Sequence, residues 1–175
     1  MALYEAGKRV AKSGSSIYRE PAMSLFGILK GALGIPHYAG IEGCRQEAEA
    51  GKAQAQFTLG GFYERGQFGL PQDYTESGKW YRKAAEQDHH AAQLYLGVYL
   101  AQGQGVELNV VEALKWILLA KRGGAWDRHA ANETQVRLEA HMTEQQIAEA
   151  RVMAGIFAAE RGDTKSAQWL DTLRR

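Results

Sequence analysis

One stretch of this sequence occurs twice in tandem and limits what the chain can fold into. Residues 92–120 repeat the order of small, aromatic and glycine positions found in residues 55–85. The Ala-Gln pair that opens the first copy returns 37 residues later, and Trp80 returns 36 residues later as Trp116. A repeat of this length is typical of helical hairpins, each of which buries its apolar face against the next. The sequence therefore predicts an all-α stack of hairpins.

Bulk composition narrows the class of protein and of partner. The chain has 175 residues, of which 45% are apolar, 20 are glycine and only 3 are proline. This composition suits a soluble globular chain with many tight turns between helices. A net charge of +1 gives no global field that would recruit nucleic acid or an anionic membrane. We therefore expect neither nucleic acid nor a membrane as the partner, and a monomer is the default oligomeric state.

The cysteine content and the N-terminus bear on the compartment. Cys44 is the single cysteine and cannot form an internal disulfide, which fits a reducing compartment. The N-terminus lacks the apolar core of a signal peptide. The most apolar run, residues 23–35, contains Lys30 and is too short to span a bilayer. A packed helix is favoured there over an interfacial membrane helix, which needs more basic residues. These features predict a cytoplasmic protein.

Decayed copies of the repeat flank the two clear ones. Residues 31–38 resemble the turn at 66–74, and at this offset Cys44 takes the place of Trp80. We therefore expect residues 1–175 to form a single helical-repeat domain with atypical capping helices at both ends, because terminal repeats must hide the open ends of a stack. Its predicted segments are an N-terminal helix at 1–18, a degenerate repeat at 19–51, repeats at 52–88 and 89–124, a degenerate repeat with a closing helix at 125–160, and a cap helix at 161–175.

Local signals place several helix starts. Asp73 and Asn109 precede the second helix of each clear repeat and are expected N-caps. Glu76 lies three residues after Asp73 and would complete a capping box. Thr143 followed by Gln146 has the same pattern at the start of the closing helix.

The repeated residues resemble a known family. The order Ala-Gln-x-x-Leu-Gly at 55–60 and 92–97, the glycine-rich turn, and Trp-Tyr-x-x-Ala-Ala at 80–85 resemble the Sel-one-like repeat, a relative of the tetratricopeptide repeat. Residues 137–151 look like the helix that often closes such arrays in bacterial members. The close match covers about residues 52–124, with Phe68 as an extra turn residue.

This resemblance implies a fold and a role. Members form an α/α solenoid with a right-handed superhelix and act as non-enzymatic scaffolds or adaptors. They often bind other proteins on the concave surface lined by the first helix of each hairpin. Carried over to this sequence, that surface would comprise Gln54, Phe57, Gly61, Glu64 and Arg65 from one repeat, and Ala91, Leu94, Val98, Ala101 and Gln102 from the next.

An apolar strip within this surface has two explanations. Phe57, Leu94 and Val98 fall outside the repeated positions that supply the hairpin contacts. A partner helix or extended peptide could cover them. Residues 1–51, or the chain's own ends, could cover them instead. The sequence leaves both explanations open.

Few residues suggest chemistry. Adjacent histidines on a helix point about 100° apart, so His89 and His90 are poorly placed to share a metal, and a polar loop is the favoured interpretation. Cys44 replaces a packing tryptophan, so we expect a buried, inert thiol. No catalytic, cofactor or metal motif is evident.

Three functional hypotheses follow. The first is a scaffold or adaptor that binds a partner protein on the concave face. The alternative is a dedicated inhibitor or immunity protein that neutralises one cognate effector enzyme or toxin, which the small number of clear repeats favours. An enzyme with a hidden site is the third hypothesis, and no residue spacing supports it.

Overall fold

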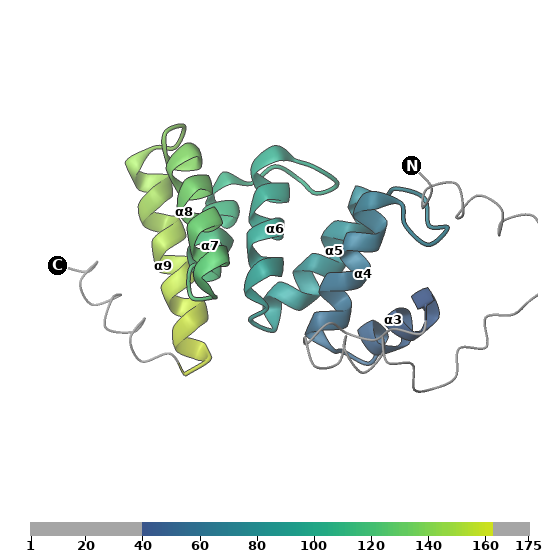
Figure 1. Ribbon diagram of the computed structural model, residues 1–175. Coiled ribbons are helices and arrows are strands. Elements are labelled where there is room, and N and C mark those ends of the chain that lie inside the picture. The colour runs from purple at the N-terminus through teal and green to yellow at the C-terminus, as the bar shows by residue number, and fades with distance from the viewer. Residues whose placement is uncertain (1–39, 163–175) are drawn as a thin grey trace, which may run out of the picture. The chain divides into compact units, whose positions relative to one another are not determined.

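The computed structural model describes residues 40–162 (Figure 1), all within one unit that covers residues 38–175. The helix expected at 1–18, the first half of the degenerate repeat, and nearly all of the cap helix expected at 161–175 lie outside the described residues. Within them the chain forms seven α-helices and no strand. These helices are α3 (Gly40–Glu49), α4 (Ala53–Arg65), α5 (Tyr74–Glu86), α6 (His90–Gln102), α7 (Val110–Ala120), α8 (Ala125–Glu139) and α9 (Glu144–Glu160).

The helices stack as consecutive hairpins. α4 packs against α5 and α6 packs against α7, and these are the two clear repeats. α3 packs on α4 and α5 packs on α6, which joins each hairpin to its neighbour. Beyond α7 the pattern changes, because α8 and α9 both pack against α7. The predicted α/α solenoid is confirmed. No helix among those described is both long and apolar enough to cross a lipid bilayer.

The expected caps form, with one exception. The Asp73 carboxylate accepts two backbone N–H groups at the start of α5, and the Asn109 side chain accepts one at the start of α7. Thr143 forms the predicted capping box with the residue three positions later. The box predicted for Glu76 is wrong, because its carboxylate pairs with Lys79 at 2.6 Å instead.

The turn of the second hairpin lies against the first hairpin. Gly105 has a φ of +67°, which favours glycine. A Cβ atom at this position would lie 2.3 Å from the carbonyl carbon of Tyr74, at the start of α5. Only glycine allows the two backbones to approach this closely, so the turn also fixes the spacing between the hairpins.

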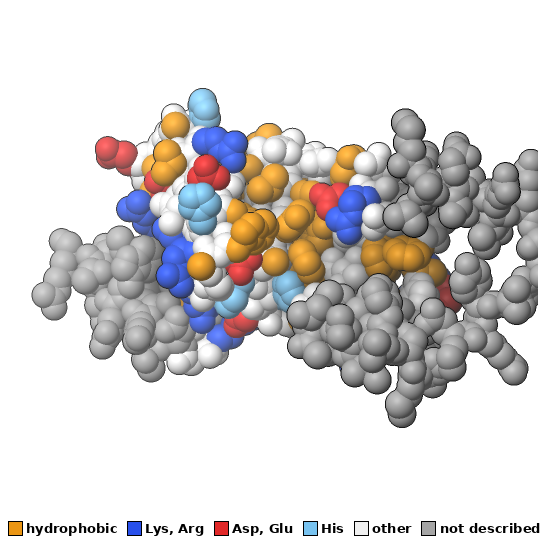
Figure 2. Space-filling view, in the orientation of Figure 1, with side chains coloured by type: hydrophobic (Ala, Val, Ile, Leu, Met, Phe, Trp, Pro, Cys, Tyr) orange, Lys and Arg blue, Asp and Glu red, His pale blue; other side chains and the backbone are white. Residues whose placement is uncertain are grey.

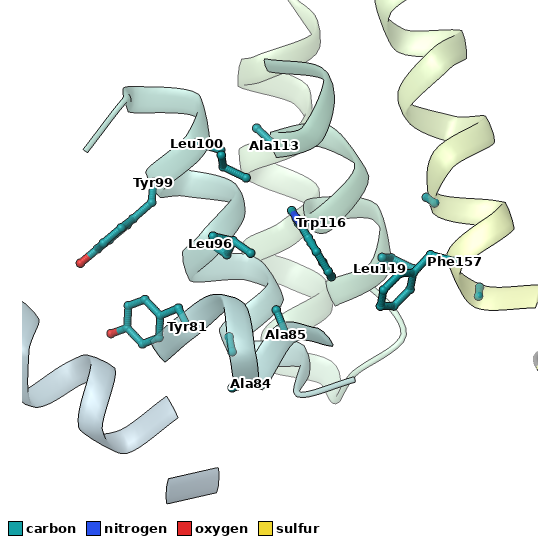
Figure 3. Close-up of a cluster of buried hydrophobic side chains, with 13 residues drawn as sticks. Tyr81, Ala84, Ala85, Leu96, Tyr99, Leu100, Ala113, Trp116, Leu119 and Phe157 are labelled. Atoms are coloured by element: carbon teal, nitrogen blue, oxygen red, sulfur yellow. The ribbon is translucent and has the colours of Figure 1, made fainter. Parts of the chain in front are cut away.

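The main core runs from α5 to α9. Trp116 is almost fully buried, and its ring meets Phe157 of α9 edge-on at 5.1 Å. Leu96 of α6 and several alanines fill the space between the helices (Figure 3). The core consists of Tyr81, Ala84, Ala85, Ala92, Leu96, Tyr99, Leu100, Ala113, Trp116, Leu119, Ala154, Phe157 and Ala158.

A smaller core joins α3 to the first hairpin. Cys44 is fully buried there with Leu59, and Trp80 packs against it from α5. The Cys44 thiol donates to the Ala55 carbonyl at 3.5 Å. Burial raises the pKa of this thiol to about 11. A thiol that stays protonated at neutral pH is a poor nucleophile, so the prediction of an inert, packed cysteine is confirmed.

A buried glutamine links each hairpin to the helix before it. Gln56 on α4 donates to the Ala48 carbonyl at 3.0 Å, and Gln93 on α6 donates to the Ala85 carbonyl at 3.2 Å. Both glutamines are at least 95% buried, and donor and acceptor both recur at an offset of 37. Each carbonyl also accepts a backbone N–H from the turn that follows its helix, Gly51 for Ala48 and Asp88 for Ala85, so the glutamine supplies a second donor near the C-terminal ends of α3 and α5.

We predict that Gln93→Ala lowers the free energy of unfolding by about 1–3 kcal/mol, because it removes a fully buried amide that donates to the Ala85 carbonyl and to Asp88 and leaves a cavity in its place. Gln145→Ala, at an exposed position of α9, is the control and should stay within about 0.5 kcal/mol. Urea unfolding followed by circular dichroism checks both values. Equal stabilities for the two variants would contradict a structural role for the buried amide.

Glycines within the helices give a second prediction. A methyl group on Gly97 would lie 2.7 Å from Ile117 Cγ1 and 3.0 Å from the Ala113 carbonyl oxygen. Gly97→Ala should therefore destabilise the fold by about 1–3 kcal/mol through overpacking.

The matched control for Gly97 is Gly61→Ala, also within a helix. A methyl group there meets the flexible guanidinium of Arg65, which can move aside. We expect this variant to be neutral or up to about 1 kcal/mol more stable, because alanine is the better helix former. Chemical unfolding distinguishes the two, and a loss of stability in Gly61→Ala as large as in Gly97→Ala would refute the difference in packing.

Candidate functional site

The predicted surface residues lie on α4 and α6, the first helices of the two clear hairpins. We call the surface of these helices with α8 the first-helix face. Figure 2 shows hydrophobic side chains gathered over α6 and between α6 and the α4–α5 hairpin. On α4, Gln54 and Arg65 are exposed and Phe57 is partly buried. On α6, Gln102 is exposed, while Ala91, Val98 and Ala101 are partly buried.

Aromatic rings from α4, α5 and α6 meet at this face. The Phe57 ring stacks on His89 with ring centroids 4.6 Å apart and contacts Tyr81 and Tyr95 at 5.5 and 5.7 Å. Phe57 and Tyr95 keep part of their surface exposed, whereas Tyr81 is buried. We call the connected rings the aromatic cluster, which consists of Phe57, Tyr74, Tyr81, His89, Tyr95 and Tyr99.

Two hydroxyl groups of the aromatic cluster are held by polar partners. The Tyr81 hydroxyl donates to Glu64 Oε2 at 2.8 Å, and the Tyr99 hydroxyl shares a hydrogen bond with Ser77 at 3.1 Å. Burial raises the pKa of Tyr81 well above its ordinary value, and the hydrogen bond to Glu64 adds to the effect. Tyr81 therefore stays protonated and acts as a fixed donor. The bond holds the Glu64 carboxylate in place at the edge of the aromatic cluster.

Glu64 also faces a cation from its own helix. Arg65 Nη1 lies 3.7 Å from Glu64 Oε2, and the Arg65 guanidinium folds back over the buried Gly61. The Arg65 side chain is half exposed, so this ion pair is screened by solvent. A half-exposed cation therefore lies beside the carboxylate that accepts the Tyr81 hydroxyl.

Leu94 corrects the predicted apolar strip. It is 5% exposed, because it packs against Ile117 and Ala120 of α7 and against Ala131 of α8. The chain's own C-terminal half therefore covers this position. Phe57 and Val98 remain partly exposed. The suggestion that residues 1–51 cover the strip falls mainly on residues outside the described range.

The two histidines also differ from expectation. They lie at the junction between hairpins, as predicted, but His89 is not a solvated loop residue. It is the N-cap of α6 and is part of the aromatic cluster. His90 Nδ1 lies 3.3 Å from the buried Gln93 amide oxygen. Among the described residues, no group of His, Cys, Asp and Glu side chains is arranged to hold a metal ion.

Sequence analysis missed Tyr95, Tyr74 and the tyrosine hydroxyl bonds. Tyr95 could have been found, because Ala91, Tyr95, Val98 and Gln102 follow the 4-3-4 spacing of one helix face. Tyr74 could not, because its contact with Tyr99 depends on how closely the second turn approaches α5.

The other titratable cluster stabilises the second-helix side. Glu112 accepts hydrogen bonds from Arg82 of α5 and from the Trp116 indole N–H at 3.1 Å. Burial lowers the pKa of Lys115, whose ammonium lies 4.2 Å from the Trp116 ring centroid. These groups are paired with one another and join hairpins. Their arrangement is that of a structural network.

Comparisons with known proteins agree with this architecture. The family model described as Sel1 repeat matches residues 53–89 and 90–124. The chain is similar to chitin synthase regulatory factor 3 of Schizosaccharomyces pombe, with 43% identity over 74 residues. That match covers 41% of this chain and only 8% of the relative.

Two solved structures are also similar. A Sel1 repeat protein from Oxalobacter formigenes is 30% identical with a TM-score of 0.52, over 97% of this chain and 72% of the other. A protective antigen present in uropathogenic Escherichia coli strains, which displays an SLR fold, is 29% identical with a TM-score of 0.65. That match covers 76% of this chain and 28% of the antigen. Sel1 repeat proteins are generally non-catalytic scaffolds for protein–protein interaction. By its tandem repeats and its stacked helical hairpins, this chain belongs to the Sel1 repeat family.

Proposed function

We propose that this chain is an interaction module that binds a partner protein on the first-helix face, with the aromatic cluster as the anchor. The observation that carries the proposal is the position of Phe57 and Tyr95, which keep exposed ring surface on one face. The hairpins do not need that surface, because alanines, leucines and buried glutamines already join them.

The chemistry of the face suits a protein partner. Aromatic side chains are enriched at the centres of protein interfaces, where a rigid ring offers a large contact area. Val98 extends the apolar surface one turn along α6 from Tyr95. Gln54, Arg65 and Gln102 are exposed and would form a polar rim around this apolar centre.

The proposal is tested with one substitution made at two positions. Val98→Arg places a long cation on the first-helix face, and Val152→Arg makes the same change on α9, where the side chain is 41% exposed. We expect Val98→Arg to weaken binding of the partner at least about tenfold, as disruption of an interface centre does. The α9 variant should bind within about twofold of the unchanged chain.

The measurement has two stages. Affinity enrichment from the native host with quantitative mass spectrometry identifies proteins retained by the unchanged chain and by Val152→Arg. Calorimetric titration of the purified candidate then gives three dissociation constants. Thermal unfolding first establishes that both variants are folded. Equal affinities for the unchanged chain and Val98→Arg would rule out the first-helix face as the binding site.

A second candidate function is the regulation of one enzyme. The observation that favours it is the similarity, over 74 residues, to a protein named as a regulatory factor of chitin synthase. If the captured partner is an enzyme, adding this chain should change its rate, and Val98→Arg should not change it. An unaltered rate at saturating concentrations of this chain would leave the scaffold function and exclude direct regulation.

A further inference from the structure

His89 joins the two clear hairpins through both of its ring nitrogens. Its Nδ1 accepts a hydrogen bond from the Ala92 backbone N–H at 3.2 Å, which caps the N-terminus of α6. Its Nε2 lies 3.2 Å from the side-chain oxygen of Gln54, on α4 of the preceding hairpin. The ring also stacks on Phe57 of α4, with 24° between the ring planes.

These contacts require one protonation state. A backbone N–H can only donate, so His89 Nδ1 must carry a free lone pair. The single ring proton is then on Nε2, where it points to the Gln54 amide oxygen. Histidine is the side chain whose ordinary pKa lies nearest physiological pH, so this arrangement is open to change by acid.

A second proton would remove the cap. It would occupy Nδ1, and the Ala92 N–H would lose its acceptor. It would also place a positive charge at the N-terminus of α6, where the helix dipole disfavours cations. The Phe57 ring would partly offset this, because aromatic faces attract cations. Burial lowers the pKa of His89, and a hydrogen bond to the residue's own backbone opposes this effect without reversing it.

The charged groups around His89 do not reverse the lowering of its pKa. His90 on the same helix lowers the pKa further, and Asp127 on α8 opposes it as the weakest contribution. Asp88 precedes His89, but its carboxylate faces two guanidinium groups and the Gln93 amide. α4 presents only uncharged groups to the ring. The facing groups are Gln54 and Phe57 from α4, His90 from α6, Asp127 from α8, and Asp88 with Arg122 and Arg161.

We propose that His89 is a pH-sensitive joint between the two repeats, which caps α6 and links it to α4 when neutral and releases the cap when protonated. The folded chain stabilises the neutral form of His89, so the pKa of His89 is lower in the folded chain than in the unfolded chain. The stabilisation is therefore fully present above about pH 6.5, the ordinary value, and is lost as the pH falls through the folded pKa.

His89 is itself part of the aromatic cluster, which is the proposed anchor for a partner. Because Phe57 stacks on His89, release of the cap would also alter the support of the aromatic cluster. This consequence for binding rests on the proposed function. The joint itself does not, and it can be tested on the chain alone, so failure of either idea leaves the other standing.

The decisive variant is His89→Asn. Asparagine is among the best N-caps and does not titrate, so the cap persists in acid. His129→Asn, at an exposed position of α8, controls for the loss of a histidine. Thermal unfolding of the full chain and both variants is compared at pH 7.5 and pH 5.0. We expect the unchanged chain and His129→Asn to lose roughly 2–4 °C more than His89→Asn over this interval.

A direct titration completes the test. The His89 ring resonance, assigned in NMR spectra by its absence from His89→Asn, should titrate with a midpoint below 6.5. A midpoint at or above that value would overturn the proposal. So would equal losses of melting temperature in the unchanged chain and His89→Asn.

Discussion

The stack depends on a buried glutamine that ties each clear hairpin to the helix before it. A buried amide side chain is costly unless its polar atoms find partners, and a buried donor or acceptor left unsatisfied costs about 1–3 kcal/mol. Gln56 and Gln93 find such partners in the Ala48 and Ala85 carbonyls near the ends of α3 and α5, each of which also accepts a backbone N–H from the following turn. Because the amide is satisfied only when its helix lies against the end of the preceding one, the bond fixes the register between the two helices. Buried alanines keep the junction between α5 and α6 compact, and Gly97 allows α6 to lie close to Ala113 and Ile117 of α7.

Where this glutamine is missing, the architecture changes. The equivalent position after Gln93 is Ala130, and α8 is held instead by small apolar contacts and by a bond from Lys121 to Gln135. A compensating link comes from Asp88, which has a φ of +60° at the position equivalent to Gly51. Its carboxylate pairs with Arg122 after α7 and Arg161 after α9. A turn residue in a left-handed conformation thus connects the two clear hairpins and the end of α9, and these ion pairs help to offset the cost of its conformation.

The sequence predicted the fold well because the features that form it are local and repeated. The recurring Ala-Gln pair, the glycine turns and the caps at Asp73 and Asn109 each act within one hairpin or across one junction. The candidate site was predicted less well. The family resemblance predicts Leu94 on the concave binding surface, yet Ile117 and Ala120 of α7 and Ala131 of α8 pack against it. The sequence predicts a polar loop at His89 because the residue lies at the junction between hairpins, and only the stacking of hairpins brings its Nε2 atom to α4.

The same reasoning explains why the first-helix face is the better candidate for a partner than the second-helix side. On the second helices the charged groups are already engaged, as in the Glu112 network and the pair between Lys79 and Glu76. The Lys83 ammonium lies over the Trp80 ring at 3.9 Å. Binding there would first have to break these contacts. On the first-helix face the Tyr81 and Tyr99 hydroxyls already have hydrogen-bond partners, which are Glu64 and Ser77. The rings of Phe57 and Tyr95 keep part of their surface exposed there. A partner can therefore gain apolar contact there without giving up an existing bond.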